Sequence, residues 1–165
     1  MSARVLREAI RAYRIGDPVG RYSVWSAEGT RQLAARWHDL GEEVIYASEH
    51  YSTALLEKLV YCNGVLPPNQ HFVEVAIPEG VSYEVVTKDS LPDWSDPVGA
   101  SARAFGSKWY RESRSAILFV PSVVARMERN VIVNARHPDW TAKRIDVGLE
   151  EPVYWDRRLF LDSSE

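Results

Sequence analysis

The sequence has little cysteine and no long apolar segment. Cys62 is the one cysteine among 165 residues, so no disulfide can form within the chain and a reducing compartment is expected. No apolar stretch approaches the roughly 20 residues that a membrane-spanning helix needs. The segment from Met1 to Ile10 carries charged residues among its apolar ones and does not have the pattern of a signal peptide. We therefore expect a soluble, cytoplasmic protein that does not bind a membrane.

The familiar ligand and metal motifs are also missing. The glycines never fall in the G-x-G-x-x-G pattern of a Rossmann domain or the G-x-x-x-x-G-K pattern of a P-loop. There is no H-E-x-x-H, no pair of cysteines for zinc and no G-x-S-x-G elbow. The formal net charge of −3 argues against direct binding of nucleic acid, which favours basic proteins. We expect no metal and no resident cofactor.

The composition is that of one globular domain. Hydrophobic residues make up 45% of the chain and charged residues 26%, which is close to the average for such proteins. Six tryptophans and eight tyrosines are many for this length. Such side chains fill cores, and they also line clefts that hold flat ligands. We expect a single domain over residues 1–165.

Short helical and strand patterns alternate along the chain without a regular strand–helix–strand rhythm, which favours an α+β fold. Helices are expected over 3–12, 28–35, 52–61 and 101–114. Strands are expected over 13–15, 43–47, 71–77, 82–87, 116–120, 130–134 and 157–161. In the helix that Ser52 would cap, the expected buried stripe consists of Leu55, Leu56, Leu59 and Val60.

Three stretches of the sequence together resemble the RES-domain family of bacterial toxins. The first stretch is Ala35-Arg36-Trp37-His38 together with residues 44–48, and the second is residues 54–60. The third is Val120-Pro121-Ser122 together with Asn130, Asn134 and His137-Pro138-Asp139. The resemblance runs from about Tyr13 to Phe160 and leaves the expected helix within residues 1–12 as an addition. Two positions depart from the family pattern, since Ala35 stands where glycine is usual and Ala135 where proline is usual.

The resemblance implies a fold, an activity and a partner. The fold would be similar to that of ADP-ribosyltransferases, with mixed and antiparallel sheets that form a cleft and are flanked by helices. The family's members are toxins of toxin–antitoxin pairs, each neutralised by an Xre-type antitoxin. Their activities include hydrolysis or phosphorolysis of NAD and, for some, transfer of ADP-ribose to a protein. NAD would be the substrate, and a homodimer is compatible with the sequence.

The family is named after an arginine, a glutamate and a serine, which fall on Arg36, Glu57 and Ser122, with Tyr46 as a fourth position. A carboxylate at Glu57 would stabilise the positive charge that develops on the ribose when nicotinamide leaves. The guanidinium of Arg36 suits paired phosphate oxygens. The alternative for Glu57 is an ordinary surface glutamate beside Lys58, and for Arg36 a solvated arginine whose stem lies on Trp37.

The other candidates have alternatives of similar weight. Tyr46 would stack on the nicotinamide ring or donate its hydroxyl to the ribose, or it is a half-buried strand tyrosine. Ser122 would bind the ligand or orient Glu57, without acting as a nucleophile, or it is a turn or helix-cap serine. Arg14 is a second candidate for the phosphates. Trp37 and Trp109 are expected in the core, and we interpret His38 as a polar support.

The sequence favours an enzyme that breaks the nicotinamide–ribose bond of NAD, with water or phosphate as the acceptor. One alternative keeps the fold but transfers ADP-ribose to a protein side chain. Another is a non-enzymatic module that acts only by binding a partner. The last possibility is an unrelated α+β enzyme whose motifs match by coincidence.

Overall fold

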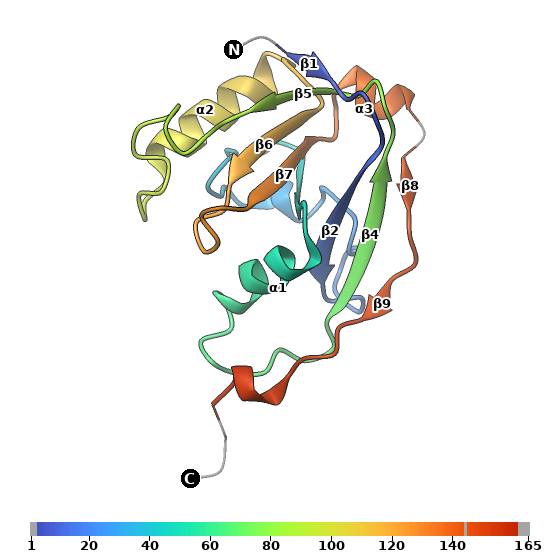
Figure 1. Cartoon of the computed structure of the whole chain (residues 1–165), viewed down its shortest axis with the longest axis vertical. Coiled ribbons are helices and arrows are strands. Elements are labelled where there is room, and N and C mark those ends of the chain that lie inside the picture. The colour runs from blue at the N-terminus through green and yellow to red at the C-terminus, as the bar shows by residue number, and fades with distance from the viewer. Residues whose placement is uncertain (1–2, 144, 162–165) are drawn as a thin grey trace.

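The chain folds into one mixed β-sheet with helices packed against it (Figure 1). The computed structural model describes residues 3–143 and 145–161. Within these residues nine strands form the sheet, in the order β1-β5-β6-β7-β3-β2-β4-β8, and β9 also pairs with β4. All neighbouring strands are antiparallel except β5 and β6. The α+β class expected from the sequence is confirmed.

The elements are short and follow one another closely. The strands are β1 (Arg4–Val5), β2 (Ile10–Gly16), β3 (Val44–Ser48), β4 (His71–Ile77), β5 (Ser82–Val85), β6 (Ile117–Pro121), β7 (Arg129–Asn134), β8 (Asp146–Val147) and β9 (Glu151–Pro152). The α-helices of the described residues are α1 (Tyr51–Leu59), α2 (Ala100–Arg111) and α3 (Pro138–Ala142). Two 3-10 turns, η1 (Thr30–Gln32) and η2 (Arg157–Leu159), complete the described elements. No described helix is long and apolar enough to cross a membrane.

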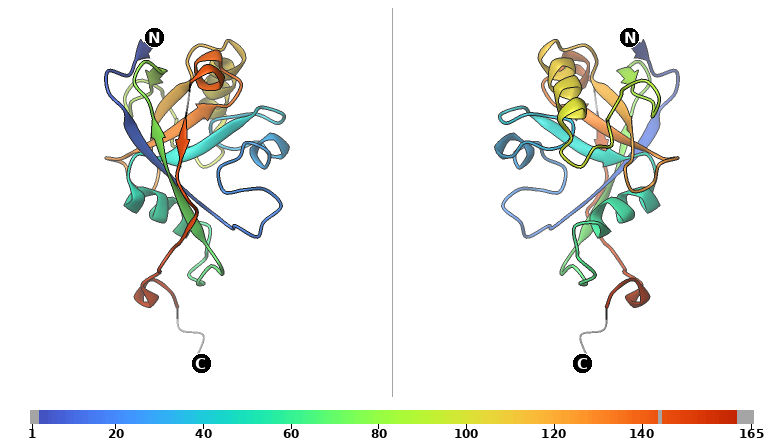
Figure 2. Two further views of the ribbon diagram at one scale, coloured as in Figure 1. Left: turned by 90° about the vertical axis from the view of Figure 1, so that its right-hand side faces the viewer. Right: turned by 90° about the vertical axis from the view of Figure 1, so that its left-hand side faces the viewer.

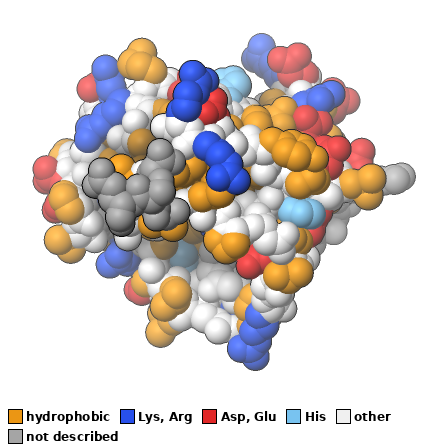
Figure 3. Space-filling view, turned by 90° about the horizontal axis from the view of Figure 1, so that it is seen from below, with side chains coloured by type: hydrophobic (Ala, Val, Ile, Leu, Met, Phe, Trp, Pro, Cys, Tyr) orange, Lys and Arg blue, Asp and Glu red, His pale blue; other side chains and the backbone are white. Residues whose placement is uncertain are grey.

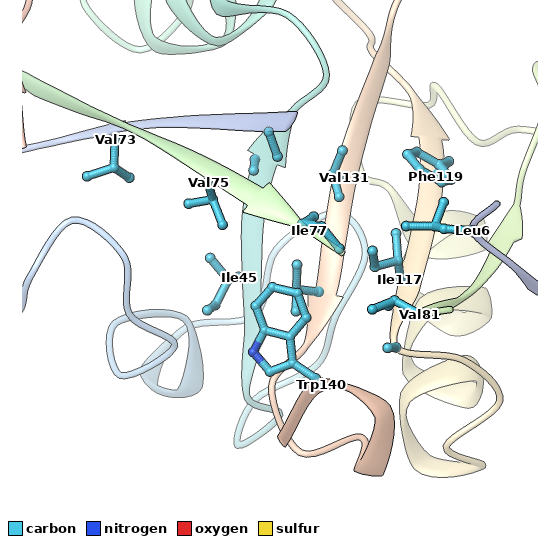
Figure 4. Close-up of a cluster of buried hydrophobic side chains, with 14 of the residues drawn as sticks. Leu6, Ile45, Val73, Val75, Ile77, Val81, Ile117, Phe119, Val131 and Trp140 are labelled. Carbon is cyan, nitrogen blue, oxygen red and sulfur yellow. The ribbon is translucent and has the colours of Figure 1, made fainter. Parts of the chain in front are cut away.

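The central strands β3, β6 and β7 bury both of their faces. Because side chains alternate along a strand, one set faces α2 and the other faces β4. Leu118 and Ile132 belong to the cluster around Trp109 of α2. The opposite set packs with the apolar side chains of β4 and with Trp140 of α3 (Figure 4). These continuous apolar runs explain why the strands were readable from the sequence.

The sheet is nearly divided at the junction of β2 and β3. β2 pairs with β4 at seven positions but with β3 only at Tyr13 and Ser48. Beyond that pair the two strands diverge, and β2 and β4 run steeply across the direction of β3 (Figure 2). Arg14 spans the gap, since its Nε donates to Val24 O and its Nη1 to Tyr46 O, each at 2.7 Å. The divergence leaves a space that the functional site uses.

Three of the expected elements are wrong, all near the ends or in loops. The helix expected over 3–12 is replaced by β1 and the start of β2, where Ala12 is fully buried opposite Val75 of β4. Long-range pairing there overrides a short helical pattern. Residues 1 and 2 of the N-terminal addition expected over 1–12 lie outside the described residues. The helix expected over 28–35 is only η1, and the strand expected over 157–161 is the turn η2.

The buried stripe expected on the helix over 52–61, which is α1, is only partly correct, since Leu55 and Leu59 are no more than half-buried. The helix begins at Tyr51 after His50, and its buried residues are Thr53 and Ala54. Leu56 is 40% exposed and Val60 50% exposed. Small side chains face β2 and β3, which allows the helix to lie close to the strands. The larger apolar side chains were therefore a misleading guide to the buried face.

We predict that Gly106→Ala is strongly destabilising. A Cβ at Gly106 in α2 would overlap the backbone oxygen of Trp37, so the helix or the Trp37 loop must shift. Overpacking of this kind typically costs about 1–3 kcal/mol, and a clash with backbone belongs at or beyond the upper end. The free energy of unfolding, measured with urea, should fall by about 3 kcal/mol or more.

Gly29→Ala is the matched control. Gly29 has φ −68° and its Cβ would meet only Tyr22 Cδ2, at 3.9 Å. Its unfolding free energy should therefore change by less than about 1 kcal/mol. Equal effects of the two substitutions would show that the contact between α2 and the Trp37 backbone is not tight.

Candidate active site

A cavity of about 820 Å³ opens where β2 and β3 diverge. Its walls are β2, β3, the C-terminal half of α1, the loop around 29–38 and the ends of β6 and β7. This volume lies within the range of about 300–1,000 Å³ that is usual for sites of small ligands. Seen from below, charged side chains of both signs and hydrophobic side chains are interspersed over that face of the molecule (Figure 3).

One face of α1 is turned toward the cavity. Ala54, Glu57, Lys58 and Tyr61 all line it. Their spacing of three, four and seven residues places them on one side of a helix, and Tyr61 continues this side just beyond α1. The small side chain of Ala54 leaves room beside the strands, so the polar side chains of the following turn reach the space. The helix thus carries a carboxylate and an ammonium group into the same cavity.

Glu57 is held by two neighbouring side chains through one of its carboxylate oxygens. Ser122 Oγ donates to Glu57 Oε1 at 2.7 Å, and Asn130 Nδ2 donates to the same oxygen at 2.6 Å. Glu57 Oε2 has no hydrogen-bond donor among the residues that the structure describes. The carboxylate is therefore fixed in orientation while its second oxygen remains available to a ligand.

Ser122 lies behind Glu57 and does not line the cavity. It follows β6, its exposed fraction is 0%, and its Oγ accepts from Ala125 N at 3.0 Å. Its single hydroxyl hydrogen is directed to Glu57, so Ser122 contacts the site through that carboxylate. Three of the four residues that the resemblance singled out line the cavity, namely Arg36, Tyr46 and Glu57. The fourth, Ser122, holds the carboxylate of Glu57.

The hydroxyl of Tyr46 belongs to a chain of hydrogen bonds. His38 Nε2 lies 2.7 Å from Thr30 O, a carbonyl that can only accept, so this nitrogen carries the proton. His38 Nδ1 is then an acceptor, and Tyr46 Oη donates to it at 2.7 Å. Trp37 N donates to Tyr46 Oη at 3.1 Å. Burial raises the pKa of Tyr46 well above its ordinary value.

The Tyr46 hydroxyl is thus already engaged within the protein, by His38 Nδ1 and the Trp37 N–H. The ring still lines the cavity. The interpretation of His38 as a polar support agrees with its contacts, because its buried ring holds the tyrosine hydroxyl and the η1 turn together.

The two arginines of the cavity are both bound to backbone carbonyls. Arg36 Nη1 donates to Trp94 O at 3.0 Å and to Asp96 O at 2.7 Å. Its other nitrogens have no hydrogen-bond partner within the described ranges. Arg14 is more deeply committed, because its Nε and Nη1 bridge the loop at Val24 and strand β3, and burial lowers its pKa. Arg14 therefore bridges the two diverging strands.

Two residues of the site were quoted in the sequence motifs without a role. Asn130 on β7 donates to Glu57, and Ser48 on β3 donates from Oγ to Asn130 Oδ1 at 2.8 Å. Ser48 and Asn130 face each other across the β3–β7 ladder. Pairing of the two strands in register would have indicated the contact. The expected core position of Trp109 is confirmed, since it is fully buried.

Comparison with models of known protein families shows to which family the chain belongs. The model of the RES domain matches residues 11–156. The chain is a member of the RES-domain family. The resemblance drawn from the three sequence stretches is therefore confirmed, and coincidental agreement of the motifs is excluded.

Relatives of this RES-domain protein carry toxin names. It is 39% identical over 139 residues to a "Prs ADP-ribosylating toxin" of Sphingobium sp. (strain YBL2), covering 81% of this chain and 85% of the relative. It is 34% identical over 136 residues to a "Toxin Res" of Photorhabdus laumondii, covering 78% and 86%. The fold matches a chain of the M. tuberculosis MbcT–MbcA toxin–antitoxin complex with a TM-score of 0.71 at 11% identity, covering 90% of this chain and 86% of that one.

We predict that Tyr46→Phe destabilises the protein. Removal of the hydroxyl leaves the Trp37 N–H and His38 Nδ1, which belong to buried residues, without their partner. An unsatisfied buried polar group costs about 1–3 kcal/mol. The urea-derived free energy of unfolding should fall by that amount.

Tyr154→Phe serves as the matched substitution, because Tyr154 is 89% exposed. Its effect should stay within about 0.5 kcal/mol. If Tyr46→Phe were as mild as Tyr154→Phe, the hydrogen-bond chain through His38 would contribute little to the stability of the site.

Proposed function

We propose that the protein is a toxin that breaks the nicotinamide–ribose bond of NAD in the cavity between β2 and β3. The observation that carries the proposal is the carboxylate of Glu57, fixed at the cavity wall through Oε1 with Oε2 free of donors among the described residues. Membership of the RES family and the toxin names of the relatives support it.

The reaction needs a group that stabilises positive charge. When the bond from ribose C1′ to the nicotinamide nitrogen breaks, its electron pair goes to the nicotinamide, which leaves neutral. Positive charge then develops on the ribose ring. A carboxylate held rigidly beside that ring stabilises the charge, because the donors that orient it are already in place. The acceptor, water or phosphate, bonds to C1′ and gives up a proton.

The remaining residues would bind and position the substrate. The ring of Tyr46 offers a flat surface for the nicotinamide. The part of the Arg36 guanidinium that has no carbonyl partner would contact phosphate oxygens. Ser122 and Asn130 would act as positioning residues through Glu57. Arg14 is assigned to bridging the strands, since its polar contacts are with Val24 O and Tyr46 O.

A protein that consumes NAD needs a partner that restrains it. The matched M. tuberculosis chain comes from a toxin–antitoxin complex, which supports a cognate antitoxin here, and we propose the Xre type. With a net charge of −3, the protein would leave DNA binding to that antitoxin. We also propose that the protein consumes the NAD of the cytoplasm. We propose, in addition, that it forms a homodimer.

A second candidate function is transfer of ADP-ribose to a protein side chain. The 39% identical relative is named as an ADP-ribosylating toxin, which favours this acceptor. Both functions share the cleavage step at C1′ and differ only in what attacks it. Mass spectrometry of cellular proteins after induction separates them, because only transfer leaves ADP-ribose on a protein.

We predict that Glu57→Gln strongly slows cleavage of NAD by the purified protein. The amide keeps the shape of the carboxylate but loses the negative charge that stabilises the ribose. Loss of one such electrostatic contact lowers kcat by about 10²–10³. Nicotinamide release, followed by chromatography, is the measurement.

Glu8→Gln provides the matched control, because Glu8 is exposed and lies away from the cavity. It should release nicotinamide at the native rate. Toxicity that survives in Glu57→Gln, with cellular NAD unchanged in both proteins, would contradict the proposal and favour a non-enzymatic binding module.

We predict that Asn130→Ala has an intermediate effect. It removes one of the two donors to Glu57 Oε1 and leaves the Ser122 bond in place. The carboxylate would lose orientation, so kcat should fall by about tenfold, the equivalent of one hydrogen bond. A rate equal to that of Glu57→Gln would mean that Asn130 takes a direct part in the chemistry.

A further inference from the structure

Lys58 differs from the other cationic side chains that line the cavity in its lack of a hydrogen-bond partner among the described residues. Arg14, Arg36 and Lys58 are the arginine and lysine residues in its wall. The two arginines donate to backbone carbonyls. Lys58 Nζ makes no side-chain hydrogen bond or ion pair with any residue that the structure describes. Lys58 is half-buried as a residue, and an ammonium group without a partner beside a ligand-sized space is available to an anion.

Lys58 and Glu57 carry opposite charges into the cavity without pairing. Consecutive helical residues differ by about 1.5 Å in height and about 100° in direction, so their side chains reach different parts of one space. The carboxylate of Glu57 is turned to Ser122 and Asn130. The wall of the cavity therefore presents a fixed negative group next to a free positive group.

This pair of charges matches the charge distribution of NAD. The nicotinamide–ribose end is cationic, and the pyrophosphate in the middle of the molecule is anionic. We infer that Lys58 binds the pyrophosphate while Glu57 faces the nicotinamide ribose, so that Lys58 selects dinucleotides over nucleosides. The inference rests on the proposed function, which it deepens by adding a specificity-determining residue to the site.

The kinetic test compares NAD with nicotinamide riboside, which has no phosphate. In Lys58→Gln the KM for NAD should rise about tenfold, the loss expected for one charge-assisted hydrogen bond, with kcat unchanged. The kcat/KM for nicotinamide riboside should stay the same. Lys58→Arg should restore most of the affinity for NAD. Lys108→Gln, on the exposed side of α2 next to Glu112, should match the native protein with both substrates.

Two kinetic results would overturn the inference. An unchanged KM for NAD in Lys58→Gln would show that the ammonium does not contact the substrate. An equal fall in kcat for NAD and the riboside would place Lys58 in the chemistry at the ribose and away from the phosphates.

Binding of ADP, measured by calorimetry, tests Lys58 without any reaction. The native protein should bind ADP about tenfold more tightly than Lys58→Gln, and the difference should shrink as salt is raised. Failure of the native protein to bind ADP, or equal binding by the variant, overturns the inference. If ADP binding depends on Lys58 but no nicotinamide is released from NAD, the pyrophosphate site stands and the proposed reaction fails.

Discussion

The divergence of β2 from β3 is the constraint on which the rest of the molecule depends. The two strands share a single residue pair, Tyr13 with Ser48, and then separate. A sheet that separates in this way exposes backbone groups that must find partners elsewhere. Arg14 supplies the partner for Tyr46 O and ties the loop at Val24 to the same point. The Arg14 side chain thereby links β2 to β3 and to the loop at Val24 in the wall of the cavity.

The wall of that cavity combines rigid supports with free polar groups. Asn130 of β7 and Ser122, just after β6, fix Glu57 through its Oε1. Ser48 of β3 in turn donates to Asn130. His38, which is itself held by Thr30 O, and the Trp37 N–H fix the hydroxyl of Tyr46. Electrostatic groups that are oriented before the substrate arrives need no reorganisation during the reaction, which is the condition for stabilising developing charge.

The sequence predicted those parts of the fold that depend on local patterns. The bounds of β4 agree with the expectation for His71 to Ile77, and the central strands follow from their apolar runs. The helix expected over 3–12 does not form, because Ala12 and its neighbours pair with β4 and take up a strand conformation. Their partners in β4 lie more than sixty residues away in the sequence. The exposure of Leu56 and Val60 could not be seen either, since the packing of α1 is decided by the strands behind it.

For the candidate site, too, the sequence indicated the residues but not their contacts. Motifs brought Arg36, Tyr46, Glu57 and Ser122 to attention, but their contacts arise only in the folded chain. Arg36 binds the carbonyls of Trp94 and Asp96, and Ser122 binds Glu57 across 65 residues of sequence. Asn130 stood in a quoted motif and received no role, because its proximity to Glu57 exists only in three dimensions. The strand-bridging contacts of Arg14 were hidden for the same reason.

A crystal structure of the Glu57→Gln protein with NAD tests the central claim most directly. The account predicts that NAD occupies the cavity between β2 and β3, with ribose C1′ next to the side chain at position 57 and the nicotinamide against the ring of Tyr46. NAD bound elsewhere, or a cavity that remains empty at saturating NAD, would contradict it.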